Sequence, residues 1–208
     1  MILKEYVTGP IEVNTYALLD EESKEAVLID VGGSFEEIKE EVSLLGYTIK
    51  FILNTHGHFD HVLGEVEVQQ NYPELPIYIH KDDTPHFSRL KEEMSFFGIP
   101  SNVESLKIDT FIDETSSLFI GKHKIQIFYT PGHSKGSLCY YVDGMLFSGD
   151  ALFCHSIGRT DFYDGDYDEL ITSIKSKLMK LPENTKVYPG HGPSTTIAEE
   201  KKHNQYLT

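Results

Sequence analysis

The sequence is poor in basic residues. Its 18 lysines and arginines stand against 33 acidic residues, and the formal net charge is −15. A nucleic-acid-binding surface needs clustered Lys and Arg to neutralise phosphates. The densest basic stretches, such as 122–124 and 201–202, hold only two such cations each. This deficit predicts that the protein does not bind nucleic acid.

Long apolar runs and a cysteine framework are missing as well. No window approaches the roughly 20 apolar residues that a membrane-spanning helix requires, and the apolar run within residues 1–10 is too short for a signal peptide. The two cysteines, Cys139 and Cys154, are too few for a disulfide framework, and their apolar neighbours favour structural roles. We therefore expect a cytoplasmic protein with reduced thiols and no membrane segment.

The length of 208 residues and the hydrophobic content of 39% are typical of one globular domain spanning 1–208. Apolar runs predict strands over residues 13–20, 25–30, 49–55, 76–80, 108–112, 118–120, 123–130, 137–144, 145–150 and 187–190. Helical spacing predicts helices over residues 35–45, 62–72, 167–181 and 195–207. Strands and helices in both halves, without regular alternation, favour a four-layer αββα sandwich.

Residues 81–105 have an irregular or partly helical pattern. We expect them to form a mobile flap whose apolar side chains pack over another part of the molecule. These side chains are Phe87, Met94, Phe96 and Phe97.

The segment NTHGHFDHVLG, residues 54–64, places three histidines and an aspartate within six positions directly after a predicted strand. His56 and His58 can point the same way around the intervening glycine, whereas Asp60 and His61 are displaced onto the first turn of the next helix. Imidazole and carboxylate groups are the ligands that divalent transition metals take. Four ligands so close in sequence suit two neighbouring metal ions better than one.

Three more candidate ligands each follow a predicted strand and lie beside glycine: His133, Asp150 and His191. Small residues there allow backbones to approach closely. A lone histidine of this kind is more often a hydrogen-bonded loop residue, but the clustering favours metal binding. The five histidines and two aspartates can fill two sites if Asp150 bridges the ions. Structural roles are expected for the other histidines, with His155 the least certain: His80, His86, His123, His155 and His203.

With these motifs the sequence resembles the metallo-β-lactamase superfamily. The match is THGHFDH at 55–61, followed by His133, Asp150 and His191 in the expected order, and it covers essentially the whole chain. Within the superfamily the sequence is most similar to short, single-domain members of the glyoxalase II group. The supporting stretches are EVNTY, TPGHSKGSLCYY, LFSGDALFCHSIGRTDF and VYPGHGPSTTIAEEK.

The resemblance implies a metallo-β-lactamase fold and two divalent metal ions, with zinc as the default and iron or manganese as alternatives. One ion would be held by His56, His58 and His133. The other would be held by Asp60, His61 and His191, with Asp150 bridging the two.

Such a pair of metals can bind a bridging hydroxide at neutral pH and stabilise an oxyanion. Asp60 and Asp150 are therefore the predicted catalytic carboxylates, primarily as ligands. The resemblance implies hydrolysis of small-molecule S-acyl thioesters, with S-lactoylglutathione as the leading candidate. Arg159 matches a basic residue that contacts glutathione in larger glyoxalase II enzymes, and its alternative role is a salt bridge to Asp161. The chain has no C-terminal helical domain of the glyoxalase II kind, so we expect weakened glutathione specificity.

Other activities stay open. A persulfide dioxygenase with a similar GRTDF stretch would hold one iron through His56, His133 and Asp150 or close neighbours. A lactonase or other ester hydrolase could use the same metal centre. A non-catalytic metal-binding module would be favoured by a missing ligand, and none of the seven is missing. Zinc β-lactamases, nucleases and flavo-diiron proteins are set aside on their motifs and domains, and the sequence predicts no oligomeric state.

Overall fold

Two six-stranded sheets face each other in the computed structural model, which describes residues 1–100, 103, 106–108 and 110–208. The first sheet has the order β1 (Ile2–Thr8), β2 (Val13–Leu19), β3 (Glu25–Ile29), β4 (Thr48–Leu53), β5 (Ile77–Ile79) and β6 (Thr110–Phe111). The second has the order β14 (Thr195–Thr196), β13 (Lys186–Pro189), β10 (Met145–Gly149), β9 (Leu138–Val142), β8 (His123–Tyr129) and β7 (Leu118–Ile120). A small hairpin consists of β11 (Leu152–Phe153) and β12 (Ser156–Ile157).

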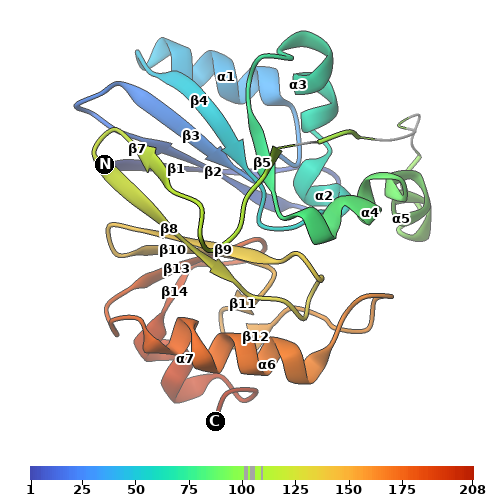
Figure 1. The fold of residues 1–208 in the computed structure, drawn as a ribbon, viewed down its shortest axis with the longest axis vertical. Coiled ribbons are helices and arrows are strands. Elements are labelled where there is room, and N and C mark those ends of the chain that lie inside the picture. The colour runs from blue at the N-terminus through green and yellow to red at the C-terminus, as the bar shows by residue number, and fades with distance from the viewer. Residues whose placement is uncertain (101–102, 104–105, 109) are drawn as a thin grey trace.

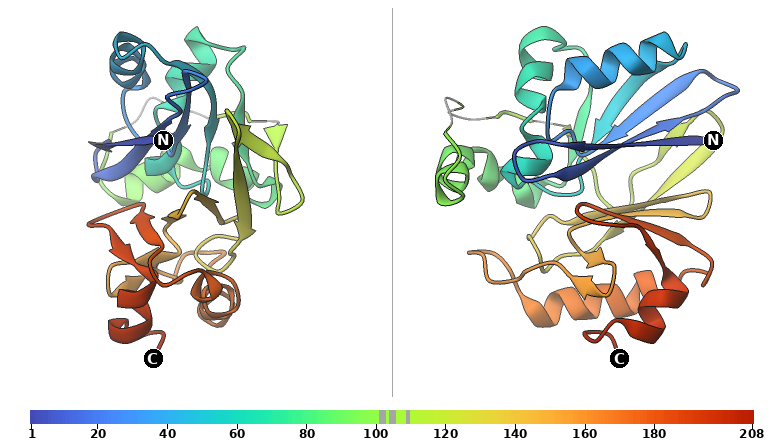
Figure 2. Two further views of the ribbon diagram at one scale, coloured as in Figure 1. Left: turned by 90° about the vertical axis from the view of Figure 1, so that its left-hand side faces the viewer. Right: turned by 180° about the vertical axis from the view of Figure 1, so that it is seen from behind.

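Helices cover the outer face of each sheet (Figure 1, Figure 2). The first half of the chain contains α1 (Phe35–Leu44), α2 (Phe59–Val62), α3 (Glu65–Asn71), α4 (Thr84–Phe87) and α5 (Leu90–Phe96). The second half contains α6 (Tyr167–Ser176) and α7 (Ile197–His203). With α1 and α3 outside the first sheet and α6 and α7 outside the second, the predicted αββα sandwich is confirmed.

The strand β2 shows how the layers are held together. All seven of its residues are buried, and successive side chains of a strand point to opposite faces. Ala17 and Leu19 belong to the apolar cluster beneath α1, whereas Tyr16 and Leu18 belong to the cluster between the sheets. A third cluster, beneath α6 and α7, packs on the far face of the second sheet.

Several element boundaries differ from the sequence predictions. The strand β1 was not predicted, because this edge strand lacks a clear apolar alternation. The single helix expected over 62–72 is divided into α2 and α3, since the amide of Gly64 bonds to the carbonyl of Val31 instead of continuing the helix. The last helix begins only at Ile197, because residues 195–196 pair with β13.

The segment 81–105 is partly helical, as predicted. It contains a 3₁₀ turn (Lys81–Asp83), α4 and α5. Phe87 and Met94 are buried in the cluster beneath the first sheet's helices, whereas Phe96 and Phe97 are exposed. Residues 101, 102, 104 and 105 lie outside the described part of the chain, and the mobility of the segment stays a prediction.

Both cysteines are unpaired, and burial raises the pKa of the Cys139 thiol to about 12. Among the helices of the described residues, none has the length and apolar character needed to cross a membrane.

The helix α1 offers a direct test of the outer packing layer. Phe35 is buried at its first position, and its ring lies 5.2 Å from that of Tyr72. Replacing a buried phenylalanine by alanine removes transfer free energy and leaves a cavity, so Phe35→Ala should lower the free energy of unfolding by about 3–5 kcal/mol in urea titration. The matched control Phe119→Ala, on the exposed face of β7, should change it by about 0.5 kcal/mol or less. Equal effects of the two substitutions would contradict this description of the core.

Candidate metal centre

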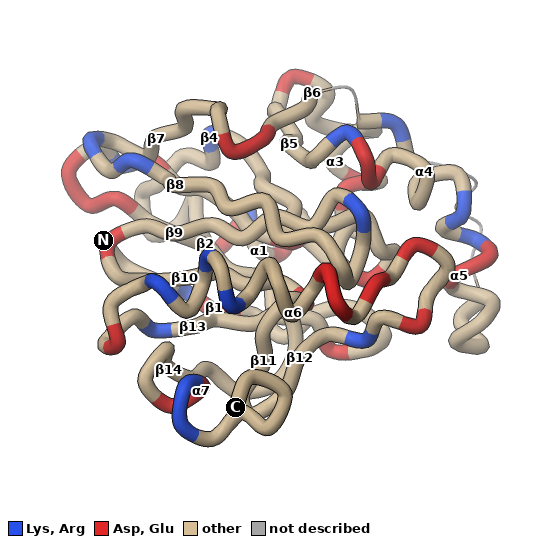
Figure 3. The backbone as a smooth tube through the Cα atoms, turned by 60° about the horizontal axis from the view of Figure 1, so that its bottom comes forward, with Lys and Arg blue, Asp and Glu red and all other residues tan. Residues whose placement is uncertain are grey.

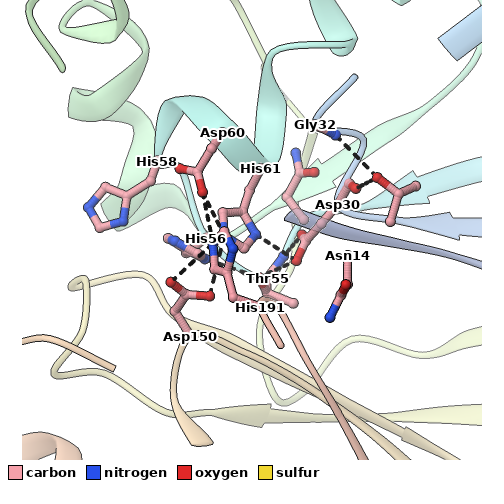
Figure 4. A network of polar contacts seen from close by, with 12 residues as sticks. Asn14, Asp30, Gly32, Thr55, His56, His58, Asp60, His61, Asp150 and His191 are labelled. Atoms are coloured by element: carbon pink, nitrogen blue, oxygen red, sulfur yellow. Dashed lines mark hydrogen bonds and ion pairs between the residues drawn. The ribbon is translucent and has the colours of Figure 1, made fainter. Parts of the chain in front are cut away.

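All seven predicted metal ligands meet at one edge of the sandwich. Figure 4 labels each of them except His133. His56 and His58 follow β4, and Asp60 and His61 lie in α2. The remaining three follow the C-terminal ends of β8, β10 and β13: His133, Asp150 and His191. Because these strands end at the same edge, residues up to 135 positions apart (His56 to His191) become neighbours.

The first ligand set consists of three buried imidazoles. His58 Nδ1 lies 2.9 Å from His133 Nε2, which lies 3.2 Å from His56 Nε2. Zinc–nitrogen bonds of about 2.0–2.1 Å in a tetrahedral site place ligand nitrogens roughly 3.3–3.4 Å apart. The three nitrogens therefore lie close enough to one another to be neighbouring ligands on one ion.

The hydrogen-bond partners of the outer ring nitrogens determine whether the inner ring nitrogens carry a proton or a lone pair. His133 Nδ1 faces the carbonyl of Arg159 at 2.8 Å, so it must carry the proton. His56 Nδ1 faces Thr55 Oγ1 at 3.1 Å, and that hydroxyl donates its own proton to Asp30 Oδ2. In its neutral form each ring would therefore direct a lone pair at the other, and a cation between them would satisfy both.

The second set contains Asp60, His61 and His191. His191 Nε2 is 3.0 Å from Asp60 Oδ2, and His61 Nε2 is 3.4 Å from the same oxygen. Asp150 lies between the sets: its Oδ1 is 3.3 Å from His61 Nε2, and its Oδ2 is 3.6 Å from His133 Nε2. This is the position that a bridging carboxylate requires.

Two buried atoms at the junction test whether the residues fit metal ions. His61 Nε2 and Asp150 Oδ1 both lack a hydrogen-bond partner. Unsatisfied buried polar atoms are rare and costly, and a coordinated cation would satisfy both. The donor set, imidazole and carboxylate with no competing lysine, is also the one that divalent transition metals take. The site therefore fits two such ions.

The pKa shifts point the same way. Burial, together with the neighbouring imidazoles, lowers the pKa of His56 and His58 well below the usual value, which keeps the metal-binding neutral form. Burial alone would raise the pKa of the Asp150 carboxyl, but the facing His61 and the other imidazoles hold it below its usual range. Burial opposes a charge on His61, yet the carboxylates around it raise its pKa well above the usual value. The second set therefore favours a positive charge.

Asp30 supports the centre and was not predicted from the sequence. It is buried at the end of β3, and its carboxylate accepts from the Thr55 amide at 2.7 Å and lies 2.9 Å from His61 Nδ1. It thereby orients the His61 ring and, through Thr55, the His56 ring. A carboxylate directly after an apolar strand and before Gly32-Gly33 was the available sequence signal.

Asp83 is the second supporting residue that was missed. Its buried carboxylate accepts from the amides of Gly57 and Gly136 at 2.8 and 2.5 Å and from the Ser134 hydroxyl at 2.8 Å. It thus joins the loop of His56 and His58 to the loop of His133. Nothing local in the sequence indicates this role.

Glycine beside the ligands is required at one position in particular. A Cβ at Gly190 would lie 2.2 Å from Asp150 Oδ1 and 2.6 Å from a ring carbon of His61. Any side chain there would displace the Asp150 carboxylate. This close approach explains the glycine that precedes His191.

The centre forms the floor of a cavity of about 470 Å³. Arg159 lies on the cavity wall, where its guanidinium makes a two-point ion pair with Asp161 at 2.6 and 2.8 Å. The salt bridge that the sequence left as the alternative is therefore formed, and contact of Arg159 with a substrate stays a prediction.

The other five histidines have protein partners. His86 is the one nearest the centre, because its ring contacts that of His58 at 4.6 Å while its nitrogens face Glu93 and Asp164. His155, despite its closeness to Asp150 in sequence, pairs with Glu199 on α7.

Asp30 gives a test of how the second ligand set is oriented. Asp30→Asn keeps the shape of the side chain but weakens the acceptor of His61 Nδ1–H, and loss of such a supporting partner typically lowers metal affinity about 10–100-fold. Competition titration with a chromophoric zinc chelator should show this loss. Asp20→Asn, a buried carboxylate in the β2–β3 turn, is the matched control and should leave the affinity unchanged. Unchanged affinity in the Asp30 variant would contradict the orienting role.

Comparison with known proteins agrees with this geometry. The family model of the metallo-beta-lactamase superfamily matches residues 8–191. The probable metallo-hydrolase YqgX of Bacillus subtilis is 36% identical over 201 residues, 96% of this chain and 94% of its own length. The hydroxyacylglutathione hydrolase GloC of Haemophilus influenzae is 33% identical over 194 residues, 92% and 91% of the two chains.

Solved structures are similar over the full sandwich. The BLEG-1 B3 metallo-beta-lactamase has a TM-score of 0.89 at 39% identity and covers 100% of both chains. TTHA1623 in a di-iron-bound form has a TM-score of 0.87 at 33% identity, covering 98% of this chain and 100% of its own. From the matched family model, the relatives and the seven converging ligands, we conclude that this chain belongs to the metallo-β-lactamase superfamily.

Proposed function

We propose that this metallo-hydrolase cleaves S-acyl thioesters, with S-lactoylglutathione as the leading substrate. The observation that carries the proposal is a complete set of seven ligands, five of which line an open cavity: His58, Asp60, His133, Asp150 and His191. No serine, threonine or cysteine is among the described residues that line this cavity, so no side-chain nucleophile of these types competes for the role. The similarity to a hydroxyacylglutathione hydrolase supports the thioester class.

The seven ligands form two sets, each of which would hold one ion. Zinc is the default metal, and iron and manganese are the alternatives. His56, His58 and His133 would hold one ion, and Asp60, His61 and His191 the other, with Asp150 shared. When bound, such ions supply a water molecule activated for attack and a Lewis acid for the thioester carbonyl. Zinc is preferred only as the commonest partner of imidazole and carboxylate, because these ligands suit iron as well.

The protein residues supply charge, orientation and shelter. Asp150 stays ionised, because the imidazoles around it keep the pKa of its carboxyl low. Asp60 faces the cavity and can accept the proton of the attacking water while it orients that water. His58 and Phe162, with ring centroids 5.2 Å apart, close one side of the reaction centre against solvent. When the C–S bond breaks, the thiolate would leave into the cavity, which Arg159 lines, and Asp60 could return the proton to it.

A mononuclear iron persulfide dioxygenase is the second candidate. It is favoured by the closeness of His133 Nε2 to both His56 Nε2 and Asp150 Oδ2, 3.2 and 3.6 Å, which allows one ion to be held by these three residues. The di-iron form of TTHA1623 shows that a similar chain can hold iron. A lactonase on the same centre is the third candidate. The sequence motifs set the zinc β-lactamases aside. The similarity to BLEG-1 is nevertheless a reason to include a β-lactam among the test substrates.

An activity panel separates these functions. Protein reconstituted with zinc, manganese or iron should hydrolyse S-lactoylglutathione faster than a lactone or a β-lactam, and it should consume no oxygen with glutathione persulfide. Loss of S-lactoylglutathione absorbance and an oxygen electrode give the two readouts. Thioester cleavage no faster than the metal-free background would overturn the glutathione assignment, and oxygen uptake would establish the dioxygenase.

The shared carboxylate should be indispensable. Asp150→Ala removes several kcal/mol of transition-state stabilisation that the paired ions provide, and we expect kcat to fall about a thousandfold or more. Asp168→Ala, an exposed carboxylate in the first turn of α6, is the control and should keep wild-type turnover. Near-normal turnover of the Asp150 variant with both metals bound would show that the shared carboxylate is not needed.

A further inference from the structure

The cavity above the metal ligands has an aromatic wall. Its rings touch in sequence from Phe59 to Phe97 (5.4 Å between centroids), from Phe97 to Phe96 (5.3 Å) and from Phe96 to Phe162 (6.4 Å). Ile11 and Tyr163 extend this apolar surface. The wall is built from α2, α5 and the loop before α6, so the segment predicted as a flap does contribute side chains to the cavity.

Both arginines of the cavity already have carboxylate partners. The Arg159 guanidinium lies over the Phe162 ring, 4.0 Å from its centroid, and makes its two-point ion pair with Asp161. Arg89 lies in the same way over Tyr163, 4.0 Å from its centroid, and bonds to both oxygens of Glu92 at 3.1 and 3.0 Å. Neither guanidinium presents an uncompensated charge to a ligand.

Charges of both signs lie at this rim. Along α5 and the residue before it, the basic Arg89 and Lys91 are followed by the acidic Glu92 and Glu93 (Figure 3). Glu93 faces the buried His86 and accepts from the amide of Phe59. The wall and rim therefore form an apolar, charge-balanced surface rather than a cationic one.

We propose that Asp161 is a specificity-determining residue: by pairing with Arg159, it weakens binding of thiol portions that carry carboxylates, glutathione included, relative to uncharged, apolar ones. This inference rests on the proposed thioester hydrolysis. Asp161 itself touches no reacting atom and acts through Arg159.

The physical reason is competition for one guanidinium edge. Asp161 occupies the Nε–Nη2 edge of Arg159, so a substrate carboxylate can take that edge only by displacing Asp161, and at Nη1 it would lie beside the negative charge of Asp161. After displacement, Asp161 would be left beside a second negative charge. An uncharged substrate leaves the pair intact and gains contact with the aromatic wall.

The first test is kinetic and uses two substrates with the same acyl group. One is S-lactoylglutathione, and the other is its diethyl ester, in which both carboxylates are masked. For the wild-type enzyme, the KM of the acid should exceed that of the diester. Asp161→Asn, at an exposed position, frees Arg159. The ratio of the KM of the acid to the KM of the diester should then fall about two- to fivefold, the range that exposed ion pairs support. The kcat of both substrates should stay the same.

Two comparison variants show whether the change in the KM ratio comes from the Arg159–Asp161 pair. Glu22→Gln removes one negative charge from an exposed ion pair with Lys122, far from the cavity, and should leave the ratio unchanged. The double variant Arg159→Gln/Asp161→Asn should lose the gain of the single variant. A ratio that stays the same in Asp161→Asn, or a gain that survives in the double variant, would overturn the inference.

Binding without turnover separates this inference from the proposed function. Calorimetry with S-hexylglutathione should show a dissociation constant about two- to fivefold lower for Asp161→Asn than for the wild type. If neither thioester is hydrolysed, the proposed function is wrong, while the calorimetric comparison still decides whether Asp161 restricts access to Arg159. Equal dissociation constants would overturn the inference even in an active thioesterase.

Discussion

The inward-facing lone pairs of the histidine rings are the constraint on which this structure depends. The outer nitrogens of His56 and His133 are held by acceptors, so in the neutral rings the inner nitrogens present lone pairs to one another. A buried arrangement of this kind is unfavourable unless positive charge occupies its centre. The ligands, their supporting residues and the close packing around them all serve to hold that arrangement in place.

The sandwich brings the ligands together without distorting regular structure. Strands of both sheets end at one edge, and each ligand lies in a loop or on the short helix α2 rather than within a strand. Asp30 and Asp83 then tie these loops to one another by hydrogen bonds between 2.5 and 2.9 Å. The core of apolar clusters supplies rigidity, and the polar network supplies the orientation that a metal centre needs.

Much of the candidate site could be predicted from the sequence, because its signals are local. Closely spaced histidines after an apolar run, and single ligands beside glycine at strand ends, indicate metal chemistry before any fold is known. The αββα layering was predictable for a similar reason, since apolar runs and helical spacing are read within short windows.

The features that escaped prediction depend on contacts between distant segments. Asp83 bonds to amides on two different loops, and the wall of Phe59, Phe97 and Phe162 comes from three separate elements. The sequence left the role of Arg159 open between a substrate contact and a salt bridge to Asp161. Its side-chain geometry shows the salt bridge, which depends on how the loop before α6 folds.

The number of metal ions bound per chain tests the two-metal centre most directly. Metal-free protein, titrated with zinc and followed by elemental analysis after removal of free metal, should retain two ions per chain. The variant His61→Ala, which disrupts only the second ligand set, should retain one. Wild-type protein that saturates at one ion would contradict the central claim that two ligand sets share Asp150.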